Sequence, residues 1–134
     1  FYAIDLGLRN AKLNFRQQER SHLMENIIYM ELISRGYSVD VGVVELTINK
    51  GGIRKKSQYE IDFVVNTGHE KIYIQSALNI DTPEKRSQET YSMKNSGDFF
   101  RKIIVVDGNV KAWNDEDGFT YVGVIPFLLN EFEL

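Results

Sequence analysis

The chain has 134 residues, of which 43% are hydrophobic, 12% aromatic and 26% charged; this fits one globular domain and excludes a disordered tail, a fibre and a coiled coil. It contains no cysteine, which excludes a disulfide framework and thiolate-bound zinc or iron–sulfur sites. The net charge of −3 is unlike that of general nucleic-acid binders, so any attraction to phosphate has to be local. No apolar run approaches the ~20 residues of a transmembrane helix and no signal peptide opens the chain, so we expect a cytoplasmic protein with no membrane partner.

The first 20 residues are expected to lead into the domain from an absent upstream portion. Residues 1–4 are apolar and are interpreted as structured core, and residues 5–9 suit a short capped helix. The chain begins with Phe1 rather than methionine. We therefore expect a single domain over residues 1–134 that is part of a longer protein.

A helix is predicted over residues 21–35. Ser21 is a good N-cap, and Gly36 supplies a stop after the last turn. The segment contains no glycine or proline, and its apolar side chains recur at helical spacing. Those side chains are Leu23, Ile27, Met30 and Ile33.

Three strands in hairpin connection are predicted next. Alternating apolar residues indicate strands over residues 37–47, 58–66 and 71–77. The glycine-containing segment 49–52 is predicted to be a turn.

The remaining chain alternates helix and strand. Thr82, followed by a proline and a glutamate, opens a predicted helix over residues 82–94. Residues 101–106 are predicted to form a buried strand and residues 119–124 a short one, and Pro126 lies near the start of a terminal helix. Three meandering strands followed by a helical crossover predict an α/β fold with a mixed sheet flanked by helices.

Carboxylates of the predicted helix 21–35 and strand 58–66 could form a shared site. Residues two apart on a strand share a face, so Glu60 and Asp62 are predicted to point together. A four-residue loop at 67–70 would place Asp62 opposite Gln75, and Glu25 would join them if it faces this hairpin. Mg²⁺ is the cation expected for such an all-oxygen site. The alternative is that Glu60 and Asp62 lie on a solvated strand face, and that Glu25, in the first turn of the predicted helix, stabilises the helix by interacting with its dipole.

Four cationic side chains lie in one seven-residue stretch of the first predicted hairpin, residues 50–56. They are Lys50, Arg54, Lys55 and Lys56. Their functional interpretation is a flexible hairpin tip that contacts DNA phosphates, and the alternative is a solvated loop. No Walker-type glycine loop is present, so we expect no ATP site in this chain.

Several short segments resemble one known family when taken in order. The sequence resembles the C-terminal domain of unknown function that follows the ATPase module in bacterial and archaeal AAA-type ATPases. That domain is similar to PD-(D/E)XK nucleases, including archaeal Holliday-junction resolvases. The matching segments are residues 2–9, 22–32, 35–37, 60–64, 73–77 and 124–129. The resemblance implies a restriction-endonuclease-like sheet of four to five strands and an ATPase partner in cis.

The catalytic pattern of these nucleases is only half matched. The pattern comprises a helix glutamate, a strand aspartate and an acid-x-lysine tripeptide around Mg²⁺, which activates water while the lysine positions the nucleophile. Glu25 and Asp62 occupy the first two positions, and Glu60 is a further candidate metal ligand. Tyr73 stands where the second acid belongs, and a phenol that ionises near pH 10 cannot replace it at neutral pH. Gln75 replaces the lysine and can orient a water without supplying charge.

This departure implies a catalytically degenerate nuclease fold that acts as a DNA- or partner-binding module beside the ATPase. Two alternatives stay open. One is an active Mg²⁺-dependent DNA endonuclease that uses Glu25, Asp62 and Glu60, with Gln75 orienting the water. The other is a structural domain for assembly of the ATPase.

Overall fold

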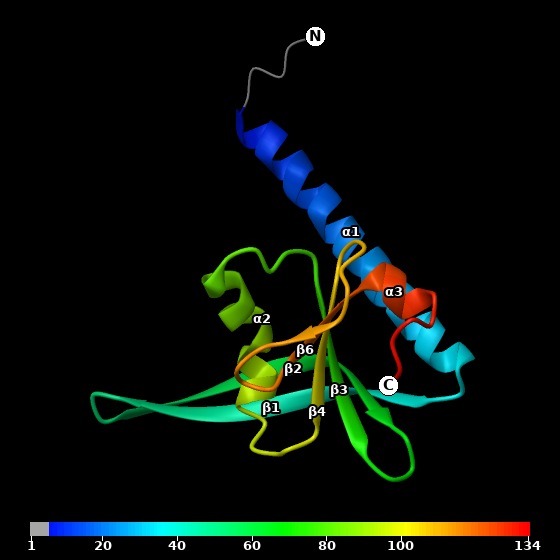
Figure 1. Ribbon diagram of the computed structural model, residues 1–134. Helices are drawn as coiled ribbons and strands as arrows, with labels where there is room; N and C mark the ends of the chain where they lie inside the picture. Colours follow the sequence, from blue (N-terminus) through cyan, green and yellow to red (C-terminus); the bar gives the residue numbers. More distant parts are fainter. Residues whose placement is uncertain (1–5) are drawn as a thin grey trace.

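Six strands form one mixed sheet with helices on both faces in the computed structural model, which describes residues 6–134 and the side chains from residue 15 onward (Figure 1). The elements are α1 (Leu6–Ser34), β1 (Ser38–Lys50), β2 (Ile53–Asn66), β3 (Lys71–Ala77), α2 (Pro83–Lys94), β4 (Arg101–Val106), β5 (Trp113–Asn114), β6 (Thr120–Gly123) and α3 (Val124–Leu128). The predicted α/β class and the mixed, helix-flanked sheet are confirmed. The interpretation of residues 1–4 as core lies outside the described residues.

The sheet has the strand order β1-β2-β3-β4-β6-β5. Strands β1 to β3 are antiparallel, β3, β4 and β6 are parallel, and β5 runs antiparallel to β6. The sheet has six strands rather than the four or five expected, because the short edge strand β5 was not predicted.

A single helix, α1, replaces the two helices predicted for residues 5–9 and 21–35. It continues through 29 residues, and Gly36 ends it with a φ of +85°, as predicted. Ser21 does not cap a helix; it lies inside α1 and its hydroxyl bonds the Glu25 carboxylate at 3.4 Å. The prediction was wrong because a serine is tolerated within a helix and no proline interrupts this segment. Neither α1 nor any other helix of residues 6–134 combines the length and apolar character needed to cross a membrane.

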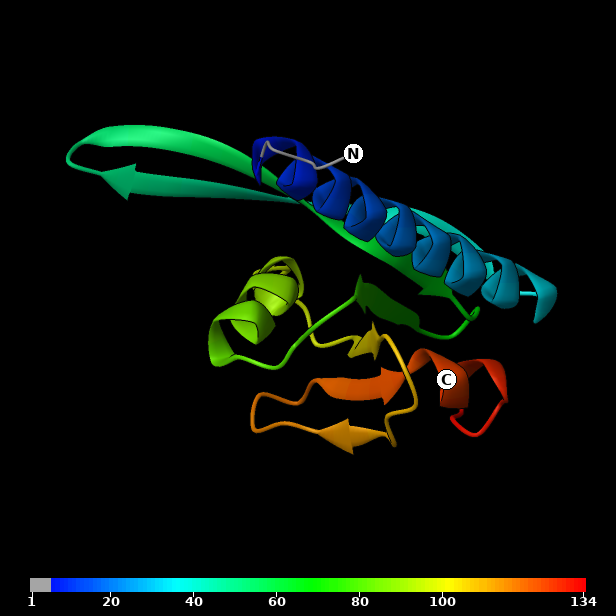
Figure 2. The same cartoon turned by 90° about the horizontal axis from the view of Figure 1, so that it is seen from above.

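The hairpin of β1 and β2 is longer than predicted. Its strands pair from Ser38 with Asn66 as far as Lys50 with Ile53. The two residues of the turn, 51–52, are glycines with φ of +57° and +81°, the tight turn whose twist matches that of the strands. The expected flexible loop is therefore a paired ribbon that extends past the rest of the domain (Figure 2). We call its outer part, residues 46–57, the arm.

A β-bulge in β2 changes which side chains share a face. The pairing register shifts between Asp40 and Gly42, so that one residue of β1 stands opposite two of β2. The sequence predicted one apolar face formed by Ile61, Phe63 and Val65. In the structure Ile61 packs in the cluster beside α2, whereas Phe63 and Val65 pack in the cluster beside α1.

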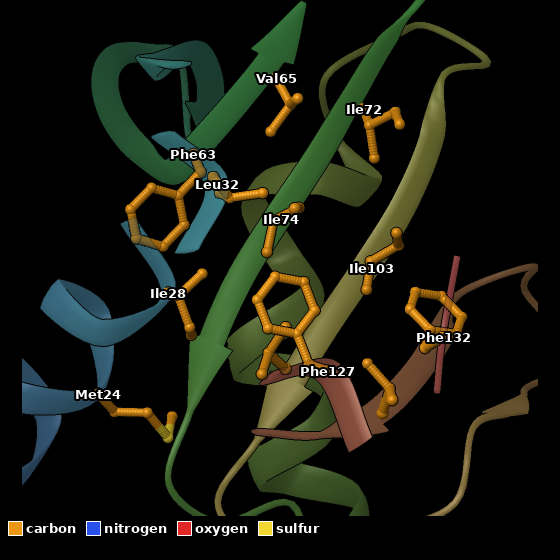
Figure 3. Close-up of a cluster of buried hydrophobic side chains, with 12 residues drawn as sticks. Met24, Ile28, Leu32, Phe63, Val65, Ile72, Ile74, Ile103, Phe127 and Phe132 are labelled. Carbon is orange, nitrogen blue, oxygen red and sulfur yellow. The ribbon is translucent and has the colours of Figure 1, made fainter. Parts of the chain in front are cut away.

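The two faces of the sheet carry separate apolar clusters. On one face, Met24, Ile28 and Leu32 of α1 and Phe127 of α3 pack on strands β2 to β4 (Figure 3). On the other face, Met93 of α2 packs on the opposite side chains of the same strands. Both clusters consist of side chains almost fully withdrawn from water, so the sheet is anchored on both sides and fixes the position of the polar residues at its end.

Gly123, at the end of β6, provides a test of this packing. A Cβ added there would lie 2.3 Å from the Val110 backbone nitrogen and 2.5 Å from the Gly108 carbonyl oxygen. Backbone cannot move aside as a side chain can, so we expect Gly123→Ala to lower the free energy of unfolding by roughly 2 kcal/mol or more in urea denaturation. The matched control is Gly42→Ala, whose new Cβ would mainly meet the Val64 side chain, at 2.8 Å. A larger loss for Gly42→Ala would contradict this account.

Candidate functional site

The site predicted from the sequence lies where β2 and β3 separate. The two strands pair as far as Phe63 with Ile74. One step further, side chains replace the backbone ladder: the Asp62 N–H donates to Gln75 Oε1 at 3.1 Å, and the Ser76 N–H donates to Asp62 Oδ2 at 2.9 Å. Asp62 and Gln75 are thus brought together as predicted.

An open cleft of about 900 Å³ borders this point. Glu60 and Gln75 line it from the sheet, and Glu89 lines it from α2. Tyr59 and Tyr91 meet across it edge to face, with ring centroids 4.9 Å apart. The crossover helix α2 therefore forms the far wall of the site.

Carboxylates surround Asp62, and their effect is visible in its acidity. Burial raises the pKa of Asp62 from 3.8 to about 6, against the lowering effect of the Ser76 N–H. The charges of Glu25, Glu89 and Glu60 contribute to the same rise. We call these four acids (Glu25, Glu60, Asp62 and Glu89) the acidic cluster. The structure thus places Glu25 and Glu60 close enough to Asp62 to influence its pKa.

Glu89 was missed by the sequence reasoning. Burial raises its pKa, a hydrogen bond with the Gln75 side chain lowers it, and the Glu25 charge raises it. The sequence contained only a weak indication of this residue. The helix α2 was expected to cover one face of the sheet, but almost all side chains of α2 are polar. Without an apolar stripe, the sequence does not indicate which side of this helix turns inward.

Tyr73 is engaged elsewhere. Its hydroxyl donates to Asp98 Oδ2, and its ring meets Phe100 edge to face with centroids 5.8 Å apart. Burial and the bond to Asp98 raise the pKa of Tyr73 to about 12. Its phenol therefore stays protonated and braces the loop before β4, and it does not supply the missing second acid.

The fit of the acidic cluster to a divalent ion is incomplete. Among the residues that the structure describes, no three histidine, aspartate or glutamate side chains are grouped so that they could hold a metal ion. In addition, Asp62 Oδ2 is already occupied by the Ser76 N–H. The role of Glu25, Asp62 and Glu60 as Mg²⁺ ligands stays a prediction.

The four predicted DNA-contacting cations lie on the arm, away from the cleft. Lys56 is four residues along β2 from Glu60, which is about 13 Å in a strand. Strand alternation places Arg54 and Lys56 on one face of the ribbon and Lys50 and Lys55 on the other. All four are exposed, and within the described part of the chain none forms a salt bridge.

The raised pKa of Asp62 can be tested by measuring how the stability of the domain depends on pH. Its pKa is higher in the folded chain, so its contribution to stability is complete below about pH 4 and lost as the pH rises through about 6. Replacement by asparagine would keep an oxygen for the Ser76 N–H without the charge. We therefore expect Asp62→Asn to raise the free energy of unfolding by about 1–2 kcal/mol at pH 8 and by much less at pH 4.

Chemical denaturation at the two pH values measures this difference. The control is Glu70→Gln, which removes an exposed carboxylate from the turn between β2 and β3. It should have little effect at either pH. An Asp62→Asn variant that is equally or less stable than the original chain at pH 8 would show that the carboxylate is not repelled by its neighbours.

Comparisons with known proteins place the chain in a family. The model of a domain of unknown function, DUF4143, matches residues 20–127. An uncharacterized protein of Haemophilus influenzae is 31% identical over 129 residues, which cover 96% of this chain and 28% of that relative. The chain thus spans less than a third of the relative's length, and no solved structure matches it significantly. The expected similarity to a domain of unknown function is confirmed, whereas the nuclease similarity and the ATPase attachment stay predictions. The chain belongs to the DUF4143 family of domains of unknown function.

Proposed function

We propose that this domain is a catalytically degenerate, nuclease-like module that binds DNA through the arm, in cis with an AAA-type ATPase. The observation that carries the proposal is the segregation of charge. Residues 46–57 contain four cations and no acid, a net charge of +4, while the whole chain has −3. The remainder of the chain therefore carries −7. The arm therefore concentrates the attraction for phosphate in one short segment.

The shape of the arm supports this role. A two-stranded β-ribbon is one of the elements that enter the grooves of duplex DNA. The arm is held in register to its last residue pair, Lys50 with Ile53, and it projects from the sheet (Figure 2). Its cations are therefore presented at fixed positions, which lowers the ordering cost of binding.

The order of elements and the state of the cleft support the degenerate nuclease part. A helix, three antiparallel strands, a crossover helix and a parallel strand follow one another, as the sequence pattern predicted, and such a mixed sheet is compatible with a nuclease-like fold. The side chains at the tripeptide positions are engaged in internal bonds: Tyr73 with Asp98, and Gln75 with the Asp62 N–H. No cation stands beside Asp62 to position a nucleophile among the described residues, since its charged neighbours are acids.

DNA binding by the arm can be tested with a charge-matched pair of variants. We expect the domain to bind duplex DNA in fluorescence anisotropy, with a slope of log K against log salt between about −2 and −4, as expected for four phosphate contacts. Arg54→Glu/Lys55→Glu should weaken binding at least ~10-fold at low salt. Lys85→Glu/Lys111→Glu changes the net charge equally at exposed sites outside the arm, and should weaken it less than about 3-fold.

Two outcomes would contradict the proposal. One is no binding at low salt, which would favour the structural role in assembling the ATPase. The other is an equal loss in both double variants, which would show that affinity follows the net charge and not the arm.

An active Mg²⁺-dependent endonuclease is the second candidate function, and Glu89 is the observation that favours it, because it adds a carboxylate near Asp62. If the site is degenerate, we expect no cleavage of linear or branched DNA above background in Mg²⁺ or Mn²⁺. Cleavage that disappears in Asp62→Asn and persists in Glu70→Gln would establish the second candidate instead.

A further inference from the structure

The tip of the arm carries one apolar side chain among its cations. Ile53 follows the glycine turn directly and is 72% exposed. Its cross-strand partner is Lys50, and its successor in β2 is Arg54. Burial in the domain does not explain this residue, because it lies at the end of the ribbon farthest from both apolar clusters. An exposed isoleucine framed by cations at a projecting tip is suited to a partner that has both phosphates and an apolar interior.

The tip is rigid enough to act as a wedge. Both residues of the turn have positive φ, which glycine adopts without strain, and the strands pair directly up to it. Ile53 is β-branched and therefore has few side-chain rotamers. Little conformational freedom would be lost when this tip is inserted.

We propose that the arm enters the minor groove of duplex DNA and inserts Ile53 between two base pairs, which bends the duplex. This inference rests on the proposed function and names its substrate, a deformable double helix. Proteins that bind the minor groove often insert an apolar side chain of this kind between bases and bend the duplex toward the major groove.

The arrangement of the cations fits this position. Arg54 and Lys56 lie on one face of the ribbon and Lys50 and Lys55 on the other. Ile53 is paired with Lys50 and therefore shares the face of Lys50 and Lys55. When this face turns toward the floor of the groove, the two lysines lie beside the inserted side chain, within reach of the phosphates that border the groove.

The charge of the residues outside the arm, which we call the body, provides a reason for bending the DNA. The residues outside the arm carry a net charge of −7, since the whole chain has −3 and the arm +4, so they repel the flanking DNA. A bend toward the major groove points away from the inserted side chain, and therefore away from the body. It lowers this repulsion while the contacts at the tip are kept.

The experiment measures binding and bending separately, on the whole 134-residue chain. Binding is followed by anisotropy, and bending by energy transfer between dyes at the two ends of a duplex of about 25 base pairs. The original chain should increase the transfer, more so with a central TA step, which kinks easily, than with a stiff A-tract. Ile53→Thr keeps the β-branch but not the apolar end. It should abolish the increase at saturation and weaken binding less than about 10-fold.

Two further variants act as controls. Ile53→Leu keeps an apolar wedge and should still bend the duplex. Val43→Ala removes an exposed aliphatic side chain, 59% exposed, from the base of the same hairpin and should change neither signal. Far-ultraviolet circular dichroism checks that each variant is folded.

The outcomes separate the two proposals. Failure of every form to bind DNA would overturn the proposed function. Binding that depends on Arg54 and Lys55 with no bending, or with equal bending by Ile53→Thr, would leave the proposed function intact and overturn the wedge. Tighter binding to vesicles containing anionic lipid than to the duplex would also overturn it, because a membrane can accept the same combination of cations and isoleucine.

Discussion

The separation of β2 from β3 at Asp62 is the constraint on which the rest of this domain depends. The bulge in β2 lets two residues stand opposite one of β1. The apolar side chains before and after the bulge therefore pack against different helices, α2 and α1. The same irregularity ends the backbone ladder to β3, and Asp62 and Gln75 close the gap with their side chains. Asp62 is therefore a structural residue as well as a candidate catalytic one. Bulges often occur next to active sites because they redirect side chains in this way.

The mutual repulsion of the acidic cluster destabilises the folded state. Four carboxylates gather near a half-buried point, and the pKa of Asp62 rises to about 6. The Ser76 N–H and the amide of Gln75 relieve part of this destabilisation. A positive charge would relieve it more effectively, but the side chain that contacts the Asp62 backbone is the neutral Gln75. The acidic cluster thus carries the electrostatic strain that is typical of a functional site.

The sequence predicted the fold better than it predicted the site. The order of strands and the register of Val64 with Tyr73 followed from alternation and loop length, because each apolar side chain had to reach a core. The bulge could not be foreseen, since the sequence from Glu60 to Phe63 alternates between polar and apolar residues as a regular strand does. Ser21 misled the prediction because its hydroxyl suits a cap and a helix interior equally. The position of Glu89 depended on the rotation of a polar helix, which is set by tertiary contacts.

In the proposed function, the separation of charge connects DNA binding by the arm with a cleft that carries out no chemistry. In a nuclease, the attraction that holds the phosphate backbone must also deliver it to the acids, and bound cations or a lysine offset their repulsion. Here the attraction lies on the arm, and Lys56, its cation nearest the cleft, is about 13 Å along the strand from Glu60. DNA held at the tip gains nothing by approaching a cluster of four carboxylates. If binding depends on the arm alone, as proposed, it tolerates Tyr73 and Gln75 at the positions where the resemblance would place a catalytic acid and lysine. The features that the proposed binding requires are instead the glycine turn and the paired strands that present the cations.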